Sequence, residues 1–177
     1  MEHVLRNGTK VTLRAPKPED AEQLVNIMKT ADRETRFLAR NPGEFQTTVE
    51  QEREIIENVL RGEGRSWLIA EYEGEVVGQC SVGYVRSNQR YQHRASVAFL
   101  IVQKCCGMGI GGKMMEECIQ WCKEHGVEQI ELDVVKENER ALRMYQSFGF
   151  EIVGTMSRAL RYPDGTYADE YMMVKVL

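Results

Sequence analysis

The stretch VQKCCGMGIGGKMM, from Val102 to Met115, decides the fold because a strand, a loop and a helix meet in it. It overlaps the end of RASVAFLIV, an almost wholly apolar run that is typical of a strand buried on both faces. Glycines then follow at positions 107, 109, 111 and 112. Beyond the first of them, apolar residues recur at helical spacing, at Ile110, Met114, Met115, Cys118, Ile119 and Cys122. A strand, a glycine loop and a helix in succession indicate an α/β unit.

Strand and helix patterns continue on both sides of this unit. Downstream they predict a strand at 128–135, a helix at 138–148 and strands at 149–160 and 167–176, joined by a hairpin turn. Upstream they predict a strand at 9–14, helices at about 18–30 and 47–62, and two strands within 66–85. The predicted fold class is α/β (α+β), with a mixed, mostly antiparallel twisted sheet of six to seven strands and helices on both faces. Residues 1–177 are expected to form a single domain.

Composition argues against several functions. The chain has 177 residues, a formal net charge of −4 and scattered Lys and Arg residues, so we expect neither a nucleic-acid nor a membrane partner. No apolar run is long enough to span a bilayer, and the N-terminal MEHVLRNGTK lacks the apolar core of a signal peptide. We therefore expect a cytoplasmic protein. Its five cysteines, an odd number, are expected to be reduced thiols.

The glycine loop is predicted to bind an anion. It brings free backbone N–H groups to the positive end of a helix dipole, and glycines let a phosphate or pyrophosphate come close. A plain strand-to-helix turn is the alternative. Two nucleotide motifs fit poorly, because Gly112-Lys113 is followed by Met114 rather than by the Ser or Thr of a Walker motif. The glycine spacing also departs from the G-x-G-x-x-G of dinucleotide-binding folds.

The chain resembles the GNAT superfamily of acyl-CoA-dependent N-acyltransferases. The resemblance runs from VAFLIVQKCCGMGIGGKMM through ELDVVKENERALRMYQSFGFEIVG, and TLRAPKPEDAEQLVNIM is similar to the family's opening strand and helix. Its most specific parts are the glycine loop and the N-x-x-A-x-x-x-Y-x-x-x-G-F run that begins at Asn138. One position departs from the family pattern, because Cys106 stands where the family has Gln or Arg. Lys104 and Lys113 are the candidate substitutes for the missing polar group.

The resemblance implies that acetyl-CoA serves as the acyl donor. In the family, loop amides grip the pyrophosphate and the end of the preceding strand pairs with the pantetheine arm. Carried onto this sequence, the pantetheine is expected along Ile101 and Val102, with a hydrogen bond from Asn138. The expected pyrophosphate contacts are the amides of Met108, Gly109, Ile110, Gly111, Gly112 and Lys113.

Tyr145 is the expected general acid. It lies nearly two helical turns after Asn138, so the two share a helical face, although core packing is the alternative explanation for this aromatic residue. Given the resemblance, its phenol can protonate the departing CoA thiolate, and a main-chain N–H near the end of the AFLIV strand would stabilise the oxyanion. Candidate bases for the attacking amine are Glu71, His93 and Glu34. Each of these could instead be a solvated charge.

The acceptor is expected to be a primary amine of a small molecule, protein or peptide. It is predicted to bind between residues 33–45 and the hairpin at 162–167, with Glu34, Phe37 and Glu44 among its contacts. The mixed charges there do not select one class of amine. Two rival hypotheses remain open: a non-catalytic acyl-CoA-binding sensor or assembly module of the same fold, and a nucleotide-binding protein. A free sheet edge would also allow a homodimer.

The cysteines are assigned no catalytic role. Cys118, Cys122 and His125 share a helical face, but the two cysteines fall within the apolar stripe and no further cluster completes a zinc site. No metal is therefore expected. Cys105 and Cys106 would become reactive only if the helix N-terminus lowered a thiol pKa.

Overall fold

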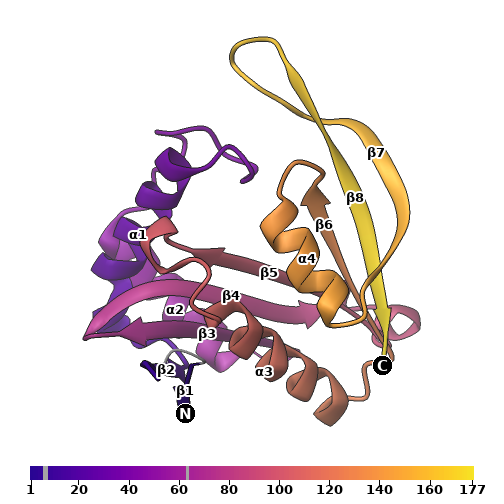
Figure 1. Cartoon of the computed structure of the whole chain (residues 1–177). Helices are drawn as coiled ribbons and strands as arrows, with labels where there is room; N and C mark the ends of the chain where they lie inside the picture. The colour runs from indigo at the N-terminus through magenta and orange to yellow at the C-terminus, as the bar shows by residue number, and fades with distance from the viewer. Residues whose placement is uncertain (6–7, 63) are drawn as a thin grey trace.

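The computed structural model describes residues 1–5, 8–62 and 64–177, which contain a sheet of eight strands and four α-helices (Figure 1). The strands are β1 (Glu2–Val4), β2 (Lys10–Arg14), β3 (Arg65–Tyr72), β4 (Glu75–Tyr84), β5 (Arg94–Ile101), β6 (Gln129–Val135), β7 (Glu151–Arg161) and β8 (Tyr167–Val176). The helices are α1 (Ala21–Glu34), α2 (Val49–Arg61), α3 (Ile110–Glu124) and α4 (Glu139–Ser147). The strand order is β1-β2-β3-β4-β5-β6-β8-β7. This is the mixed sheet that the sequence predicts.

The sheet splits along its one parallel contact. β5 and β6 pair only through 94–96 with 129–131, yet β5 continues to Ile101 and β6 to Val135. Figure 1 shows the two strands diverging beyond the paired section. We call the unpaired stretches 97–101 of β5 and 132–135 of β6 the β5–β6 split. Because β4 and β8 still pair with the outer edges of these strands, only the edges that face the split are free.

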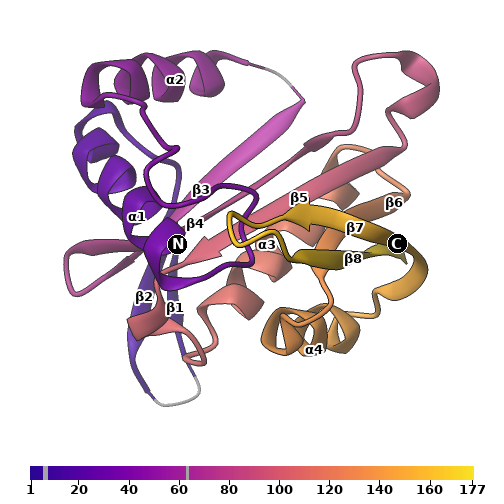
Figure 2. The ribbon, with the colours of Figure 1, turned by 90° about the horizontal axis from the view of Figure 1, so that it is seen from above.

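The helices cover the two faces of the sheet, as the neighbouring residues Gln79 and Cys80 on β4 demonstrate. Gln79 contacts Met28 of α1, with 2.8 Å between Nε2 and Sδ, whereas Cys80 lies 3.8 Å from Cys118 of α3, sulfur to sulfur. Successive side chains of a strand point to opposite faces, so α1 and α3 lie on opposite sides. Figure 2 shows α1 and α2 on one side and α3 and α4 on the other. We call these the α1 face and the α3 face.

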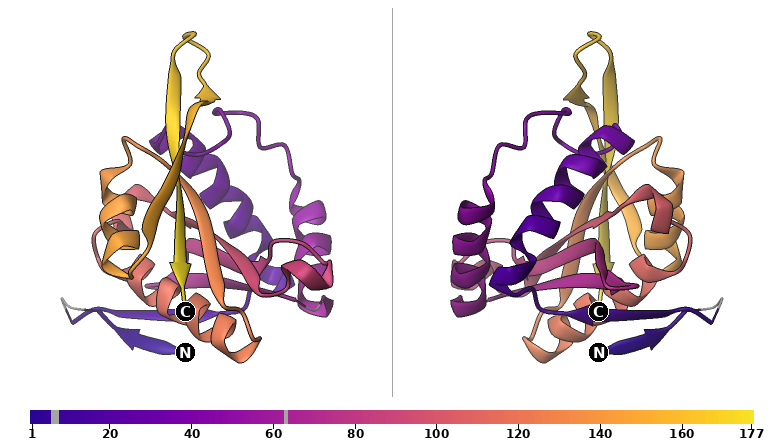
Figure 3. Two further views of the ribbon diagram at one scale, coloured as in Figure 1. Left: turned by 90° about the vertical axis from the view of Figure 1, so that its right-hand side faces the viewer. Right: turned by 90° about the vertical axis from the view of Figure 1, so that its left-hand side faces the viewer.

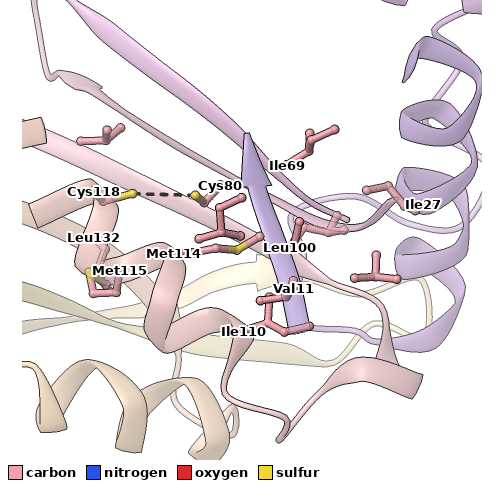
Figure 4. Close-up of a cluster of buried hydrophobic side chains, with 14 of the residues drawn as sticks. Val11, Ile27, Ile69, Cys80, Leu100, Ile110, Met114, Met115, Cys118 and Leu132 are labelled. Carbon is pink, nitrogen blue, oxygen red and sulfur yellow. Dashed lines mark hydrogen bonds between the residues drawn. The ribbon is translucent and has the colours of Figure 1, made fainter. Parts of the chain in front are cut away.

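The core lies on both faces of the sheet, and one large part of it lies between α3 and the sheet (Figure 4). The apolar stripe that the sequence predicts on this helix is buried, with exposed fractions of at most 2% for Ile110, Met114, Met115, Cys118 and Cys122. Burying a large aliphatic side chain contributes about 1.5–3 kcal/mol, so this stripe fixes α3 firmly against the sheet. The glycine loop is attached to the N-terminal end of that helix and is therefore held in place by the core.

Two helix boundaries and one additional strand differ from the sequence prediction. The helix expected at 18–30 is a 3₁₀ turn at Pro18–Asp20 followed by α1, which continues one further turn to Glu34. The helix expected at about 47–62 is α2, which begins at Val49 after a capping box formed by Thr48 and Gln51. The eighth strand is β1, which pairs with β2 and is too short for its alternation to be recognised. No helix in the described part of the chain is long and apolar enough to cross a membrane.

Candidate active site

The glycine loop presents unpaired backbone N–H groups at one point. Gly109 is the N-cap of α3 with a φ of 95°, and the first helical hydrogen bond runs from the N–H of Lys113 to the carbonyl of Gly109, at 3.2 Å. The N–H groups of the residues between them have no helical partner. Among the described residues they have no other partner either. With the helix dipole behind them, these groups have the arrangement that the predicted anion site requires.

The loop glycines are needed for different reasons. Gly107 and Gly109 have φ values of 84° and 95°, in the left-handed region that other residues rarely adopt. Gly111 instead permits close packing, because a Cβ there would lie 2.9 Å from the sulfur of Met144 on α4. The loop thus combines an open backbone with a tight contact between α3 and α4.

The side chains around the loop supply little free positive charge. The Nζ of Lys113 lies 2.8 Å from Glu116, and that of Lys104 lies 2.6 Å from Glu75, so each ammonium group already has a carboxylate partner. The Sγ of Cys106 lies 3.7 Å from the carbonyl oxygen of Ile101 and so turns back toward β5. Burial raises the pKa of the Cys105 thiol, opposite to the shift that a reactive cysteine needs. Attraction of an anion therefore rests mainly on the backbone.

The free edge of β5 faces the split. The N–H of Val102 donates to the carbonyl of Val77 at 3.0 Å, which turns the backbone of that residue toward β4. Backbone groups alternate in direction along a strand, so those of Phe99 and Ile101 point toward β6, where no strand pairs with them. Of the two residues predicted to contact pantetheine, Ile101 thus presents backbone groups that no strand pairs with, although the Cys106 thiol contacts its carbonyl, whereas the N–H of Val102 is already used.

Tyr145 lies beside the split on the α3 face. Its ring centroid is 6.2 Å from that of Phe99 on β5 and 5.9 Å from that of Phe150. The residue is only 8% exposed, and no group among the described residues hydrogen-bonds its hydroxyl. Burial, and to a lesser extent Cys118, raises the pKa of Tyr145 to about 12. The phenol therefore keeps its proton at neutral pH and is available as a donor.

Asn138 lies at the N-terminus of α4 as its N-cap. Its Oδ1 accepts a hydrogen bond from the N–H of Ala141 at 3.3 Å, which starts the helix that carries Tyr145. The side-chain amide N–H groups of Asn138 have no partner within the described residues. The structure therefore leaves them free for a ligand in the neighbouring split.

The opposite face of the sheet carries, beside the split, two carboxylates that sequence reasoning missed, those of Asp133 and Glu170. Arg94 of β5 and Glu131 of β6 form a two-bond ion pair, both contacts 2.7 Å, and therefore share a face of the sheet. Alternation along β6 puts Asp133 on that face, and its paired residue Met172 puts Glu170 there as well. Exposed Ser96 and Ala98 of β5 also lie on this face. It is the α1 face, because Leu100 lies two residues after Ala98, therefore on the same face, and pairs with Gln79.

Glu170 is half-buried and has no ion-pair partner in the described part of the chain. Its pKa is raised above the usual glutamate value, mainly by burial and to a smaller extent by the nearby Asp133. A signal for this residue was present in the sequence. Asp169 and Glu170 are consecutive in a predicted strand, so one of them had to point toward the less exposed face.

The structure does not bring the predicted bases Glu71 and His93 to the split. Glu71 lies on β3, two strands from β5, and its carboxylate is held by Arg14 at 2.8 Å from Nη2. Arg14 also binds Asp20, so this ion-pair cluster ties the start of the chain to the sheet. His93 immediately precedes β5, at the closed end where β5 and β6 are paired. Neither residue is near Tyr145.

A pocket of about 680 Å³ opens between residues 32–42 and the tip of the β7–β8 hairpin at residues 159–164. Figure 3 shows the hairpin rising beyond the rest of the sheet. Glu34 lines the pocket, and its Oε2 accepts a hydrogen bond from the N–H of Gln103 at 2.7 Å. Phe37 and Glu44 do not line it, and Glu44 instead binds the N–H and side-chain amide of Asn41 within its own turn. Of the predicted acceptor contacts, only Glu34 lies in the pocket wall.

Four arginines surround the pocket, two of them held by other residues and two without an ion-pair partner in the described part of the chain. Arg40 is bound by the buried Asp32 through two contacts of 3.0 and 3.1 Å, and Arg36 contacts the hairpin. Arg33 and Arg161 line the pocket, are exposed and have no ion-pair partner among the described residues. These two guanidinium groups are therefore available to a negatively charged group in the pocket.

A split sheet, a glycine-loop anion site and a buried tyrosine together define an acyl-CoA-dependent transferase of the GNAT type. The family described as Acetyltransferase (GNAT) domain matches residues 13–172, and the chain belongs to it. It is an N-acetyltransferase, as the resemblance read from the sequence implied. The nucleotide-binding alternative is therefore set aside.

Similar proteins carry related names. The L-amino acid N-acetyltransferase AaaT of Escherichia coli strain K12 is 34% identical over 115 residues, covering 64% of this chain and 69% of that protein. The phosphinothricin N-acetyltransferase of Streptomyces viridochromogenes is 22% identical over 134 residues, covering 75% and 73%.

Solved structures agree on the fold. A GNAT-family acetyltransferase from Streptococcus pneumoniae superposes with a TM-score of 0.88 at 24% identity, covering 94% of this chain and 99% of that one. The yncA protein of Salmonella typhimurium, solved with acetyl-CoA, gives a TM-score of 0.80 at 20% identity, covering 94% of each chain. At these identities the similarity establishes the fold.

Proposed function

We propose that this N-acetyltransferase moves the acetyl group of acetyl-CoA to the primary amine of a small acceptor that carries a carboxylate, such as an L-amino acid. The observation that carries the proposal is the β5–β6 split, with the loop amides at its end and Tyr145 beside it. The free guanidinium groups of the pocket support the carboxylate. The name of the E. coli relative, an L-amino acid N-acetyltransferase, points to the same acceptor class.

Acetyl-CoA binds through its pyrophosphate and through the amides of its pantetheine arm. The pyrophosphate is held by the amides from Met108 to Lys113, of which those of Ile110, Gly111 and Gly112 have no helical partner and that of Lys113 donates to Gly109. The pantetheine arm has two amides and lies along Phe99 and Ile101 in the manner of an added strand. Asn138 donates to it from the other wall of the split. Extending along β5, the arm brings its thioester to the level of Tyr145.

The reaction is direct transfer. The neutral amine nitrogen attacks the thioester carbonyl carbon, a C–N bond forms, and the C–S bond breaks. The proton that the nitrogen loses balances the one that the departing sulfur takes up. A backbone N–H of β5 stabilises the oxyanion, and Tyr145 donates its proton toward the departing sulfur. An ordinary thiol has a pKa of about 8.5, so a phenol with a pKa of about 12 stays protonated while the thiolate forms. Its first contribution is therefore a hydrogen bond to the developing charge.

The acceptor arrives from the α1 face. Its carboxylate is held by Arg33 and Arg161, and its ammonium group turns toward Asp133 and Glu170. Glu170 takes the ammonium proton, because its raised pKa suits it to accept protons nearer neutral pH. It lies one strand beyond β6, about 4.8 Å further from β5, so the proton passes through a water molecule. Glu71 and His93 are not assigned this role.

Calorimetric titration with acetyl-CoA, followed by free-thiol release over a panel of amines, tests the proposal. The panel contains L-amino acids, their amides, spermidine and a short peptide. We expect acetyl-CoA binding, and release that is fastest with free L-amino acids and weaker with the amides, which lack the carboxylate. No acetyl-CoA binding at millimolar concentration would contradict the proposed donor. Tight binding without release for any amine would favour the non-catalytic sensor.

A further inference from the structure

The acceptor pocket has two walls that are far apart in the sequence. One is the loop after α1, and the other is the tip of the β7–β8 hairpin, which lie side by side in Figure 2. Among the described residues, every hydrogen bond, ion pair and ring contact between these walls has Arg36 on one side.

Arg36 makes four such contacts. Its guanidinium carbon lies 3.8 Å from the ring centroid of Tyr162, and its Nη2 donates to the hydroxyl of Thr166 at 3.2 Å. The same nitrogen lies 3.8 Å from a carboxylate oxygen of Asp164. In return, the hydroxyl of Tyr162 donates to the backbone carbonyl of Arg36 at 3.0 Å. The contacts thus come from both the side chain and the backbone of one residue.

The hairpin tip has little else to hold it. The residues from Pro163 to Tyr167 are exposed, so they lack a buried apolar anchor. Below the tip, the β7–β8 register shifts between Met156 and Leu160, and Arg158 adopts a φ of 56°. A β-bulge of this kind bends a strand and interrupts its ladder. The position of the tip over the pocket therefore depends on its contacts with the opposite wall.

We propose that Arg36 is a positioning residue that ties the two pocket walls together and so limits the size of the acceptor. This inference rests on the proposed function, because it concerns the acceptor site of that reaction. A small amino acid fills the tied pocket, and a bulky one has to displace the tip. Since the ties are exposed, each is weak by itself, and selectivity arises from their sum on one side chain.

Three variants isolate these ties. Arg36→Ala removes the side-chain contacts, Arg36→Lys keeps the charge but loses the planar stacking on Tyr162, and Tyr162→Phe removes only the hydrogen bond to the Arg36 carbonyl. Arg61→Ala is the matched control, since Arg61 is an exposed arginine at the end of α2, paired with Glu57 on its own helix. All four changes are on the surface and should leave the fold intact.

For Arg36→Ala we expect the KM of a small L-amino acid to rise about tenfold, with the KM of acetyl-CoA within twofold of wild type. The ratio of kcat/KM for a bulky aromatic amino acid to that for alanine should rise by a similar factor. Arg36→Lys should fall between wild type and Arg36→Ala, and the control should match wild type. An unchanged ratio in Arg36→Ala would overturn the proposal.

Hydrogen exchange in the free protein gives a readout that does not depend on the reaction. In Arg36→Ala, amides of residues 159–167 should exchange faster than in wild type, while those of the glycine loop should not change. Equal exchange at the tip would overturn the tie, whatever the activity. If the wild-type protein released no thiol with any amine, the proposed function would fail, and the exchange result would still decide whether Arg36 holds the walls.

Discussion

The proposed donor site and the proposed acceptor site of this enzyme are formed by different kinds of groups. On the donor side, the glycine loop and β5 present backbone groups, and buried residues of α3 hold them rigidly. On the acceptor side, exposed side chains on a loop and a hairpin tip are held by ion pairs and one cation–π contact. The donor is common to the family, whereas the acceptor differs between relatives named for L-amino acids and for phosphinothricin. In the proposed sites, the constant donor would bind to rigid backbone groups and the variable acceptor to replaceable side chains.

The largest expected effect belongs to Tyr145→Phe on the donor side. Removing only the hydroxyl should lower kcat about 100-fold, because the leaving sulfur loses its donor, while the KM of acetyl-CoA stays within twofold. The hydroxyl has no partner within the described residues, so the melting temperature should hardly change. Steady-state kinetics and thermal unfolding measure these quantities. Tyr84→Phe, on the same face but bonded to the His125 carbonyl, is the control. A kcat within threefold of wild type would remove Tyr145 from this role.

Next in size is Gly109→Val. A β-branched residue is strained at a φ of 95°, which costs about 1–3 kcal/mol and should raise the KM of acetyl-CoA about 30-fold as the loop rearranges. Gly74→Val is the matched control, since Gly74 has a φ of 80°, open space around it and a position in the β3–β4 turn. It should lose similar stability and keep the wild-type KM. If both variants gave the same KM, the loop would not be the donor site.

Glu170→Gln tests the acceptor side and should lower kcat about tenfold at neutral pH, with acetyl-CoA affinity unchanged. The pKa of Glu170 is raised in the folded state, by burial and then by Asp133. The neutral form is therefore favoured by folding, and its stabilising contribution is complete below the unfolded pKa of about 4.3 and lost as pH rises through the raised value. The Gln variant should accordingly have a higher melting temperature than wild type at pH 7 but not at pH 4.

The groups around Glu170 allow the assignment of the base to be checked. Asp133 faces it from β6 beside the Arg94–Glu131 ion pair, and from β7 its paired residue is the uncharged Met156. Asp133→Asn should lower the pKa of Glu170 and move the acidic limb of the kcat profile to lower pH. If Asp133→Asn abolished that limb and Glu170→Gln left it intact, Asp133 would be the base instead.

The smallest effect is expected from Cys106→Gln, which restores the family residue. An amide at this position can brace the loop more strongly than the weak thiol contact with the Ile101 carbonyl, so the KM of acetyl-CoA should fall about threefold. Cys122→Ala, buried on α3 away from the loop, should change stability and leave that KM alone. A rise in KM for Cys106→Gln would mean that the smaller thiol is itself required.

The sequence predicted the loop and the helices of the proposed donor side, because the signals for these elements are local. The position of Gly109 between an apolar strand and a helical stripe defined the loop, and the spacing from Asn138 to Tyr145 defined α4. The acceptor side depends on contacts between distant segments, such as Arg36 with Tyr162, and no local pattern encodes these. For the same reason the sequence alone does not rule out Glu71 and His93 as bases. Their distance from the split follows from strand order and register, which only the folded sheet reveals.

The proposed function requires acetyl-CoA to bind in the β5–β6 split with its pyrophosphate on the glycine-loop amides. The most direct test is a titration of isotope-labelled protein with acetyl-CoA, followed through the backbone amide signals. The largest shifts are expected at residues 108–113 and at Phe99 and Ile101 on β5, with little change at Gly74 or in α2. Saturating shifts confined to other residues, or no shifts at millimolar acetyl-CoA, would contradict it.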